Sequence, residues 1–124
     1  MTTYYKDHST LGNRARQIWG ILIGYAHRRQ TITYGKLAKL LGFDGVGVQM
    51  PHRLGAVAFW CKENGLPGLT SIVVKEDIGL PGEGTPVESV SLEQARTYDT
   101  DWYDIEPPTA EELEKAYADH SEAA

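Results

Sequence analysis

The segment TITYGKLAKLLG, residues 31–42, decides how the first half of the chain folds. Thr33 is a residue type that often caps a helix, because its hydroxyl accepts a hydrogen bond from a free N–H group in the first turn. Gly42 suits the left-handed conformation that ends many helices. We therefore predict a short helix from Tyr34 to Leu41, preceded by a very short strand at residues 30–32. Its buried side is predicted to carry Leu37, Leu40 and Leu41.

Two longer helices are predicted on either side of this segment. Thr10 is a suitable N-cap for a helix over about residues 11–28, whose apolar residues recur three and four positions apart. Another helix is predicted from about Pro51, or slightly earlier, to Glu63, since proline is tolerated in a first turn and Asn64-Gly65 follows. The apolar stripes are Leu11, Ala15, Ile18, Trp19, Leu22 and Tyr25 in the first, and Leu54, Val57, Ala58 and Cys61 in the second.

The residues after the third helix predict β structure and a turn. Leu69 to Val74 is a short apolar run rich in β-branched residues, which is typical of a strand. Residues 77–84 are rich in Gly and Pro and predict a loop that carries a wing. Three helices, short strands and such a loop indicate an α+β fold, mainly α, of the winged helix-turn-helix kind.

The last part of the chain is acidic and predicts weaker helices. Ser91 and Gln94 have capping-box spacing and predict the start of a fourth helix. Residues 98–106, YDTDWYDIE, combine aromatic and acidic side chains, and Thr109 caps a final helix from Ala110 to about Tyr117. We expect three parts: a flexible arm over 1–9, a winged-helix-like domain over 10–97 and an acidic C-terminal extension over 98–124.

Charge is distributed very unevenly between the two halves. Residues 1–62 hold nine Lys and Arg and two acidic residues, a net charge of +7. Residues 63–124 hold three Lys and Arg and fifteen acidic residues, a net charge of -12. Such asymmetry favours a nucleic-acid-binding face on the first half, although charged residues can also simply be solvated.

Several other features limit the protein class. The single cysteine, Cys61, excludes an intramolecular disulfide. The start of the chain lacks the apolar core of a signal peptide, and the apolar run over 18–26 is too short to span a bilayer. We therefore expect a cytoplasmic protein without membrane contact.

Polar and basic side chains around the predicted helix-turn-helix are candidates for DNA contacts. Lysine and arginine there would neutralise phosphates, and Gln49 and Arg53 are chemically able to read base edges. Tyr34 could hydrogen-bond a phosphate or stack on a base. Two alternatives stay open: Arg53 could pair with an acid of the second half, and Tyr34 could pack over the first helix. The candidate DNA-binding residues are Tyr34, Lys36, Lys39, Gln49, His52 and Arg53.

The same region resembles a known family. Residues 31–42 resemble the T-Y-G-x-(I/L)-A-x-x-x-G segment in the C-terminal domain of O6-alkylguanine-DNA alkyltransferases and the related alkyltransferase-like proteins. The resemblance covers roughly residues 14–84 and implies a winged helix in which Tyr34 and Arg53 help to extrude a nucleotide from the duplex. The family's P-C-H-R-V-V motif is absent, and residues 69–74 read LTSIVV instead. Further similar segments are 16–22, 53–58, Asn64, Pro67 and 72–74.

The sequence contains no recognisable catalytic or metal-binding pattern. A nucleophile needs a base within reach, and no histidine is placed to serve Cys61. The four histidines lack metal-ligand spacing, and the acidic cluster at 99–106 lacks the glycine and spacing of a calcium loop. We expect a non-catalytic protein without cofactor or metal.

Three functions follow in order of preference. The first is a DNA-binding winged helix with a regulatory or accessory role. The second is a protein-interaction module that uses the acidic, aromatic residues of 98–124, or an intramolecular variant in which this segment covers the basic face. The third is recognition of a DNA lesion, which requires a pocket beside Tyr34 and Thr70-Ser71.

Overall fold

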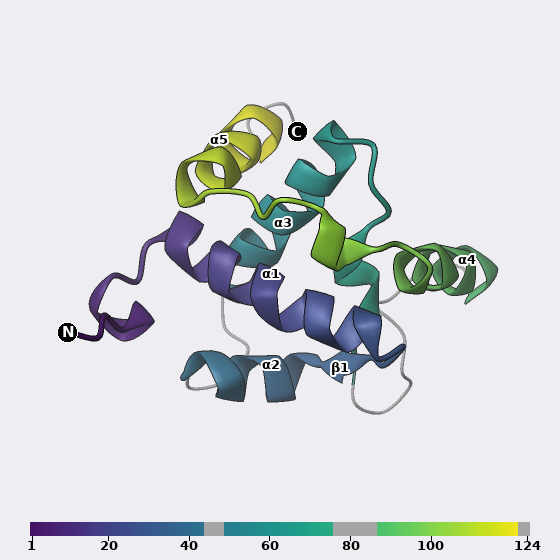
Figure 1. The fold of residues 1–124 in the computed structure, drawn as a ribbon, viewed down its shortest axis with the longest axis horizontal. Coiled ribbons are helices and arrows are strands. Elements are labelled where there is room, and N and C mark those ends of the chain that lie inside the picture. The colour runs from purple at the N-terminus through teal and green to yellow at the C-terminus, as the bar shows by residue number, and fades with distance from the viewer. Residues whose placement is uncertain (44–48, 76–86, 122–124) are drawn as a thin grey trace.

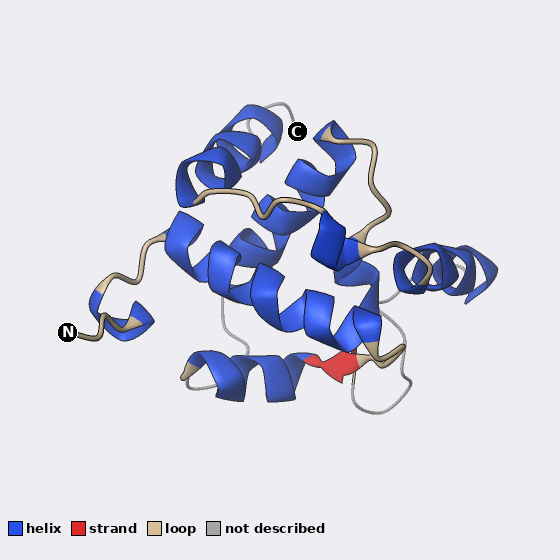
Figure 2. Ribbon diagram, in the orientation of Figure 1, coloured by secondary structure: helices blue, strands red, loops and turns tan. Residues whose placement is uncertain are grey.

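A computed structural model describes residues 1–43, 49–75 and 87–121. The protein is mainly helical, with a short two-stranded sheet, as the sequence predicted (Figures 1 and 2). Three 3-10 turns, η1 to η3, connect or precede the main elements. The elements are η1 Tyr5–Asp7, α1 Leu11–His27, β1 Ile32–Thr33, α2 Tyr34–Leu41, α3 Gln49–Glu63, η2 Leu69–Ile72, β2 Val73–Val74, α4 Val87–Tyr98, η3 Trp102–Asp104 and α5 Ala110–Ser121.

Helix α1 forms the centre of the molecule. It crosses the middle of Figure 1, with α2 below it and α3 and α5 above it. The predicted Thr10 cap is confirmed, since Thr10 Oγ1 accepts a hydrogen bond of 3.1 Å from the Asn13 N–H. Ile18, Trp19 and Leu22 are fully buried, as their helical spacing predicted.

Helix α2 has the predicted bounds, and both of its ends are explained by local chemistry. Thr33 Oγ1 accepts from the Lys36 N–H at 3.1 Å. Gly42 has a φ of 80°, and the Phe43 N–H reaches back to the Ala38 carbonyl at 2.9 Å. One prediction here is wrong: Leu40 is exposed, because at 100° per residue it lies to the side of the arc formed by Leu37, Ala38 and Leu41.

The predicted strand over 69–74 is largely wrong. Leu69–Ile72 forms the turn η2, in which Ser71 N–H donates to the Gly68 carbonyl at 2.9 Å. This turn places Leu69 and Ile72, three residues apart, in the core together. The strand β2 is limited to Val73–Val74 and pairs in parallel with β1, Ile32 opposite Val73. The predicted wing loop, 77–84, lies outside the described residues.

Helix α4 begins earlier than the sequence predicted. It already runs from Val87, so the capping box at Ser91 and Gln94 is wrong and Ser91 is an interior helical residue. The helix is docked on η2 through Thr97, whose hydroxyl donates to the Gly68 carbonyl at 3.1 Å. Gln94 Nε2 also donates to the Ser71 carbonyl at 3.0 Å.

The last third of the chain belongs to the core. Thr109 caps α5 as predicted and exchanges two hydrogen bonds of 3.1 Å with Glu112, and α5 then continues to Ser121. Trp102 and Leu113 are buried in the same cluster as Trp19. The expected boundary near residue 98 therefore does not separate an extension from a folded unit. None of the helices in the described parts is long and apolar enough to cross a membrane.

The contact between the start of α1 and α5 requires glycine at position 12. A Cβ there would overlap the Ala110 carbonyl oxygen and lie 2.6 Å from Glu114 Oε2, which accepts the Gly12 N–H at 3.1 Å. We expect Gly12→Ala to lower the free energy of unfolding by about 1–3 kcal/mol in chemical denaturation. In the same helix, a Cβ at Gly20 would meet no described atom within 4 Å. Gly20→Ala should therefore raise the free energy of unfolding by roughly 0.5–1 kcal/mol. Equal effects of the two substitutions would contradict this packing.

Candidate nucleic-acid interface

A surface hollow lies where α2, α3, η2 and α4 meet. Its volume is about 480 Å³, within the range of roughly 300–1,000 Å³ found for ligand pockets. It contains Tyr34 together with Thr70 and Ser71, so the pocket that the lesion-recognition hypothesis requires is present. The lining residues are Tyr34, Pro51, Leu54, Gly55, Ala58, Gly68, Thr70, Ser71 and Glu93.

The hollow has an apolar wall and a polar side. Leu54 and Ala58, four residues apart on α3, lie on the same face of that helix and form part of the wall. Thr70 and Ser71 provide hydroxyl groups that both donate and accept. Such a combination suits a flat, mostly apolar ligand with hydrogen-bonding groups at one edge.

Glu93 brings a carboxylate to the polar side of the hollow. Its position follows from the docking of α4 on η2, in which Thr97 and Gln94 bond to backbone carbonyls. Glu93 is half-buried, and its Oε1 atom is buried without a hydrogen-bond partner in the described structure. A buried carboxylate oxygen without a hydrogen-bond donor is costly in free energy.

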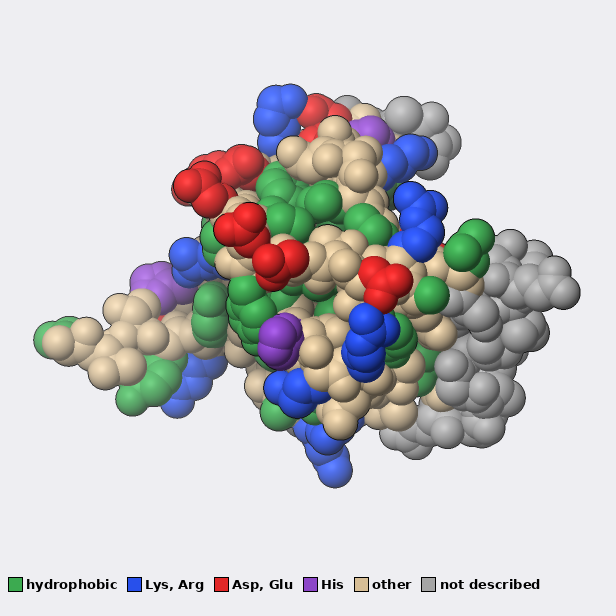
Figure 3. Space-filling view, turned by 45° about the vertical axis from the view of Figure 1, so that its right-hand side comes forward, with side chains coloured by type: hydrophobic (Ala, Val, Ile, Leu, Met, Phe, Trp, Pro, Cys, Tyr) green, Lys and Arg blue, Asp and Glu red, His purple; other side chains and the backbone are tan. Residues whose placement is uncertain are grey.

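Basic side chains lie on α2, on the side of the helix away from Tyr34, and at the end of α1. Lys36 Nζ lies 5.6 Å from the centroid of the Tyr25 ring, and the Arg28 guanidinium lies 4.7 Å from the same centroid. Lys36 and Lys39 are exposed, one turn apart on α2. In Figure 3, Lys and Arg side chains lie at the lower edge and also at the top and right of the molecule, whereas the visible Asp and Glu side chains lie in its upper part.

Four of the six predicted contact residues belong to α2 or the first residue of α3. Tyr34 is half-buried, packs against the hydrophobic core and also lines the hollow. Lys36 and Lys39 are exposed as predicted. Gln49 is the first residue of α3, but its side chain lies outside what the structure describes.

Arg53 does not lie where the sequence placed it. Its side chain is only 8% exposed, and its guanidinium lies 5.1 Å from the centroid of the Phe43 ring. Arg14 lies 5.0 Å from the same centroid. Burial, and secondly the charge of Arg14, lower the pKa of Arg53. In this position Arg53 does not offer its donors to base edges, and it is not a surface residue either.

His52 faces another part of the molecule. Its Nδ1 atom is hydrogen-bonded to the Tyr117 hydroxyl of α5, and the two rings meet edge to face with centroids 5.6 Å apart. His52 is therefore a contact between α3 and α5 that remains exposed, and it does not line the hollow.

Sequence reasoning missed Glu93 and the α3 wall. Leu54 and Ala58 were assigned to the inner stripe of α3, and both also line the hollow. No local pattern indicated Glu93, since it reaches the hollow through the docking of α4 on η2. The surface ion pair between Arg29 and Asp99, at 2.7 Å, similarly joins the basic and acidic halves of the sequence.

Cys61 has neither the exposure nor the low thiol pKa of a cysteine nucleophile. It is fully buried, and burial raises the pKa of its thiol to about 11. A hydrogen bond with the Leu69 backbone lowers this pKa by a smaller amount, and the charge of Glu93 raises it by less still. A thiol in this state is inert near neutral pH, because the thiolate is the reactive form. This agrees with the absence of the alkyl-acceptor motif from the sequence.

The raised pKa of Cys61 predicts a pH dependence of stability. The folded state holds the Cys61 proton more tightly than the unfolded state. The stabilisation of the folded state by the neutral thiol is therefore complete below about pH 9 and is lost as the pH rises towards 11. We expect the stability advantage of the wild type over Cys61→Ala to fall by about 2–3 kcal/mol between pH 8 and pH 11. Denaturation of both proteins across this range measures it, and a constant difference would contradict the burial of a neutral thiol.

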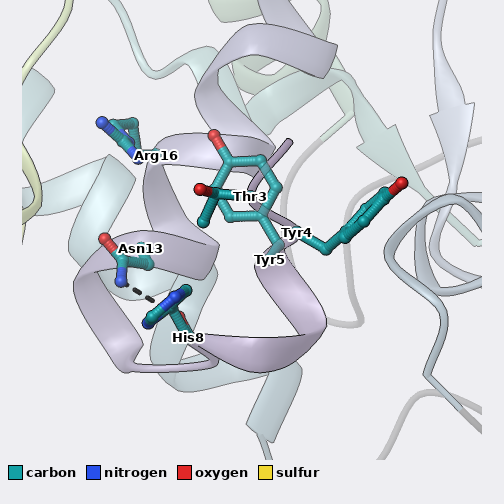
Figure 4. A pocket seen from close by; sticks show the side chains of 6 residues that line it. All are labelled: Thr3, Tyr4, Tyr5, His8, Asn13 and Arg16. Carbon is teal, nitrogen blue, oxygen red and sulfur yellow. Dashed lines mark hydrogen bonds between the residues drawn. The ribbon is translucent and has the colours of Figure 1, made fainter. Parts of the chain in front are cut away.

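A smaller hollow lies between η1 and the start of α1 (Figure 4). Its volume is about 270 Å³, and its walls are mostly exposed side chains of the arm. Asn13 Nδ2 donates to the His8 carbonyl at 3.0 Å, and Arg16 lies 5.7 Å from the Tyr5 ring centroid. None of the predicted contact residues lines it, so we place the candidate site at the hollow that Tyr34 lines. Its lining residues are Thr3, Tyr4, Tyr5, His8, Asn13 and Arg16.

Within residues 1–43, 49–75 and 87–121, no three His, Cys, Asp or Glu side chains are grouped so that they could hold a metal ion.

The chain matches no protein-family model, no curated protein and no solved structure.

Proposed function

We propose that this protein is a non-catalytic DNA-binding protein that docks through α2 and the start of α3 and takes one extruded nucleotide into the hollow beside Tyr34. The observation that carries this proposal is the hollow itself, which is lined by Tyr34 of α2, the helix that also carries the exposed Lys36 and Lys39. The role is regulatory or accessory, and we expect it in the cytoplasm.

The basic side chains supply the affinity. Lys36, Lys39 and Arg28 would contact phosphates and release counterions, a contribution that is independent of base sequence. Base readout by α3 is a smaller part of the proposal, because Arg53 is buried and His52 is turned towards α5. Affinity for the backbone and selectivity at the hollow are thus supplied by different residues.

The hollow supplies the selectivity. Proteins that extrude a base read it by stacking and by hydrogen bonds to its exposed edge. Here Tyr34 and the α3 wall of Leu54 and Ala58 would contact the flat faces, and the hydroxyls of Thr70 and Ser71 would meet the edge. The helices α1 to α3 and the β1–β2 pair support a winged-helix-like domain of the alkyltransferase-like kind without an alkyl acceptor.

Filling the hollow tests this function. We expect the wild-type protein to bind a duplex with one unpaired nucleotide about tenfold more tightly than the fully paired duplex, since an unpaired base costs less to extrude. Ala58→Phe should abolish this preference and keep the affinity for paired DNA. The matched control is Ala118→Phe, at an exposed position of α5. Equal affinities of the wild type for both duplexes would overturn the proposal.

The burial of Trp102 weakens the hypothesis of a protein-interaction module. Trp102, the largest aromatic residue of the 98–106 segment, is buried against Trp19 and is unavailable to a partner. Tyr103 is exposed, but it already contacts the His27 ring at 4.9 Å between centroids. The nucleic-acid function is therefore the one that the described surface favours.

A further inference from the structure

We infer that a second groove, between the N-terminal arm and the C-terminal end of α2, binds a phosphate group of a single-stranded nucleic acid, with Arg14 as its fixed anchor. The inference rests on the proposed function, because it continues the DNA-contacting surface of α2 onto the arm. The groove has a volume of about 420 Å³ and is lined by residues 3–6, by Arg14 and Gln17 of α1, and by residues 39–42. It shares no lining residue with the hollow beside Tyr34.

Arg14 is held in one orientation before a ligand arrives. Its Nε donates to Ser9 Oγ at 2.9 Å, and its Nη1 donates to the Leu41 carbonyl at 2.7 Å and to Gln17 Oε1 at 3.0 Å. The guanidinium also lies 5.0 Å from the centroid of the Phe43 ring. A side chain fixed by such contacts loses little conformational entropy when it binds an anion.

The second terminal nitrogen of Arg14 is left for a ligand. Among the described residues, no acceptor takes a hydrogen bond from Nη2. This atom is also not one of the described side-chain nitrogens that are closed to solvent without a hydrogen bond, so it is open to solvent. Because Arg14 lines the groove, the two N–H groups of Nη2 can donate to a ligand there.

Arg14 carries a charge that no described carboxylate neutralises. It is only 6% exposed, its three acceptors are uncharged, and it forms no ion pair with a described residue. A largely buried charge is costly in free energy unless an opposite charge is close. Lys6 and Lys39, both exposed, also line the groove, and no described Asp or Glu does. The groove therefore favours an anion, and a guanidinium with ammonium groups beside it suits the oxygens of phosphate.

The surroundings of the groove favour a single strand as the source of the phosphate. The Tyr4 ring is 56% exposed, and its centroid lies 5.5 Å from Lys6 Nζ, so an aromatic face and a cation lie side by side. Proteins that bind single strands combine such cations with aromatic rings on which unpaired bases stack. Lys39 belongs both to this groove and to the proposed DNA-contacting face of α2, so a strand that leaves the duplex can continue from α2 to the arm.

A dinucleotide and its uncharged analogue test the site on the full chain. Backbone amide shifts of the ¹⁵N-labelled protein are followed while the dinucleotide TpT, or its methylphosphonate analogue, is added at constant ionic strength. The analogue keeps the bases and sugars but lacks the phosphate charge. We expect TpT to bind about tenfold more tightly, with shifts at Lys6, Arg14 and Leu40, because hydrogen bonds between charged groups are strong. Equal binding of the two compounds, or shifts only at the hollow beside Tyr34, would overturn the inference.

Substitutions then assign the binding to named cations. Arg14→Lys keeps a positive charge but lacks the second terminal nitrogen, and should weaken TpT binding about tenfold. Because Arg14 also joins α1 to the end of α2, Lys6→Gln gives an independent measurement at an exposed position and should weaken binding about threefold. The control Lys62→Gln makes the same change of charge at an exposed position of α3 and should leave the affinity unchanged. Equal effects of the Lys6 and Lys62 substitutions would overturn the inference.

The source of the phosphate is tested with two compounds that carry the same phosphate monoester charge, 5′-thymidylate and N-acetylphosphoserine amide. We expect thymidylate to bind about fivefold more tightly, because its base can stack on Tyr4. Equal or tighter binding of the phosphoserine compound would overturn the inference in favour of a phosphopeptide ligand.

A duplex with a short thymidine overhang separates this inference from the proposed function. We expect the wild type to bind it about tenfold more tightly than the blunt duplex, and Lys6→Gln to reduce this preference about threefold. An overhang preference that Lys6→Gln leaves unchanged would overturn the inference and leave the proposed function intact. Binding of TpT in the groove by a protein that shows no preference for a duplex with an unpaired nucleotide would do the reverse.

Discussion

Replacing Trp102 with alanine is expected to lower the free energy of unfolding by about 3–5 kcal/mol, the range for large aromatic residues removed from a core. The side chain is 2% exposed, and its ring meets Trp19 edge to face at 5.5 Å between centroids. Its Nε1–H donates to the Thr97 carbonyl at 2.7 Å. Alanine would thus leave a cavity and remove one of the two hydrogen bonds that the Thr97 carbonyl accepts, the other coming from the Thr100 N–H.

The neighbouring residue provides the control. Tyr103 is 59% exposed, so Tyr103→Ala should cost less than about 1 kcal/mol in the same denaturation experiment. A loss below about 1 kcal/mol for Trp102→Ala as well would mean that the acidic segment is only appended to the domain. Because the segment belongs to the core, deletion from residue 98 should unfold the protein, and binding experiments require the full chain.

Reversing two charges on α2 is expected to weaken duplex binding by about 100-fold at low salt. Lys36 and Lys39 are both exposed and one turn apart, so each can reach a phosphate of the same backbone. The double variant Lys36→Glu, Lys39→Glu removes two favourable contacts and introduces repulsion at both places. Fluorescence anisotropy with a labelled duplex measures the change.

A second double variant separates a local contact from the effect of net charge. Lys62→Glu with Lys115→Glu changes the net charge by the same amount at exposed positions of α3 and α5. We expect it to weaken binding by less than about fivefold, since distant exposed charges are screened. An equal loss in both double variants would place the DNA elsewhere or reduce the interaction to overall charge.

The parts of the fold that could be predicted are those governed by local chemistry. The caps at Thr10, Thr33 and Thr109 and the glycine at the end of α2 were predicted correctly, because each depends on one side chain and the adjacent backbone. The buried stripe of α1 follows from spacing along one helix. Exposure of Lys36 and Lys39 follows in the same way from their places on α2.

The parts that could not be predicted depend on contacts between distant segments. The Leu69 to Val74 run has strand composition, but the core accepts Leu69 and Ile72 from one side, which a 3-10 turn provides. Arg53 is buried, and its guanidinium lies over the ring of Phe43, ten residues earlier. Trp102 enters the core because α1 places Trp19 there. Glu93 reaches the hollow through the docking of another helix.

The central claim is that α2 and the hollow beside it form a DNA-binding face. The most direct measurement is the affinity of the full wild-type chain for a labelled duplex across a series of salt concentrations. With Lys36, Lys39 and Arg28 each neutralising a phosphate, log K should fall linearly with log salt with a slope of about -3. No binding at the lowest salt concentration, or an affinity that does not change with salt, would contradict the claim.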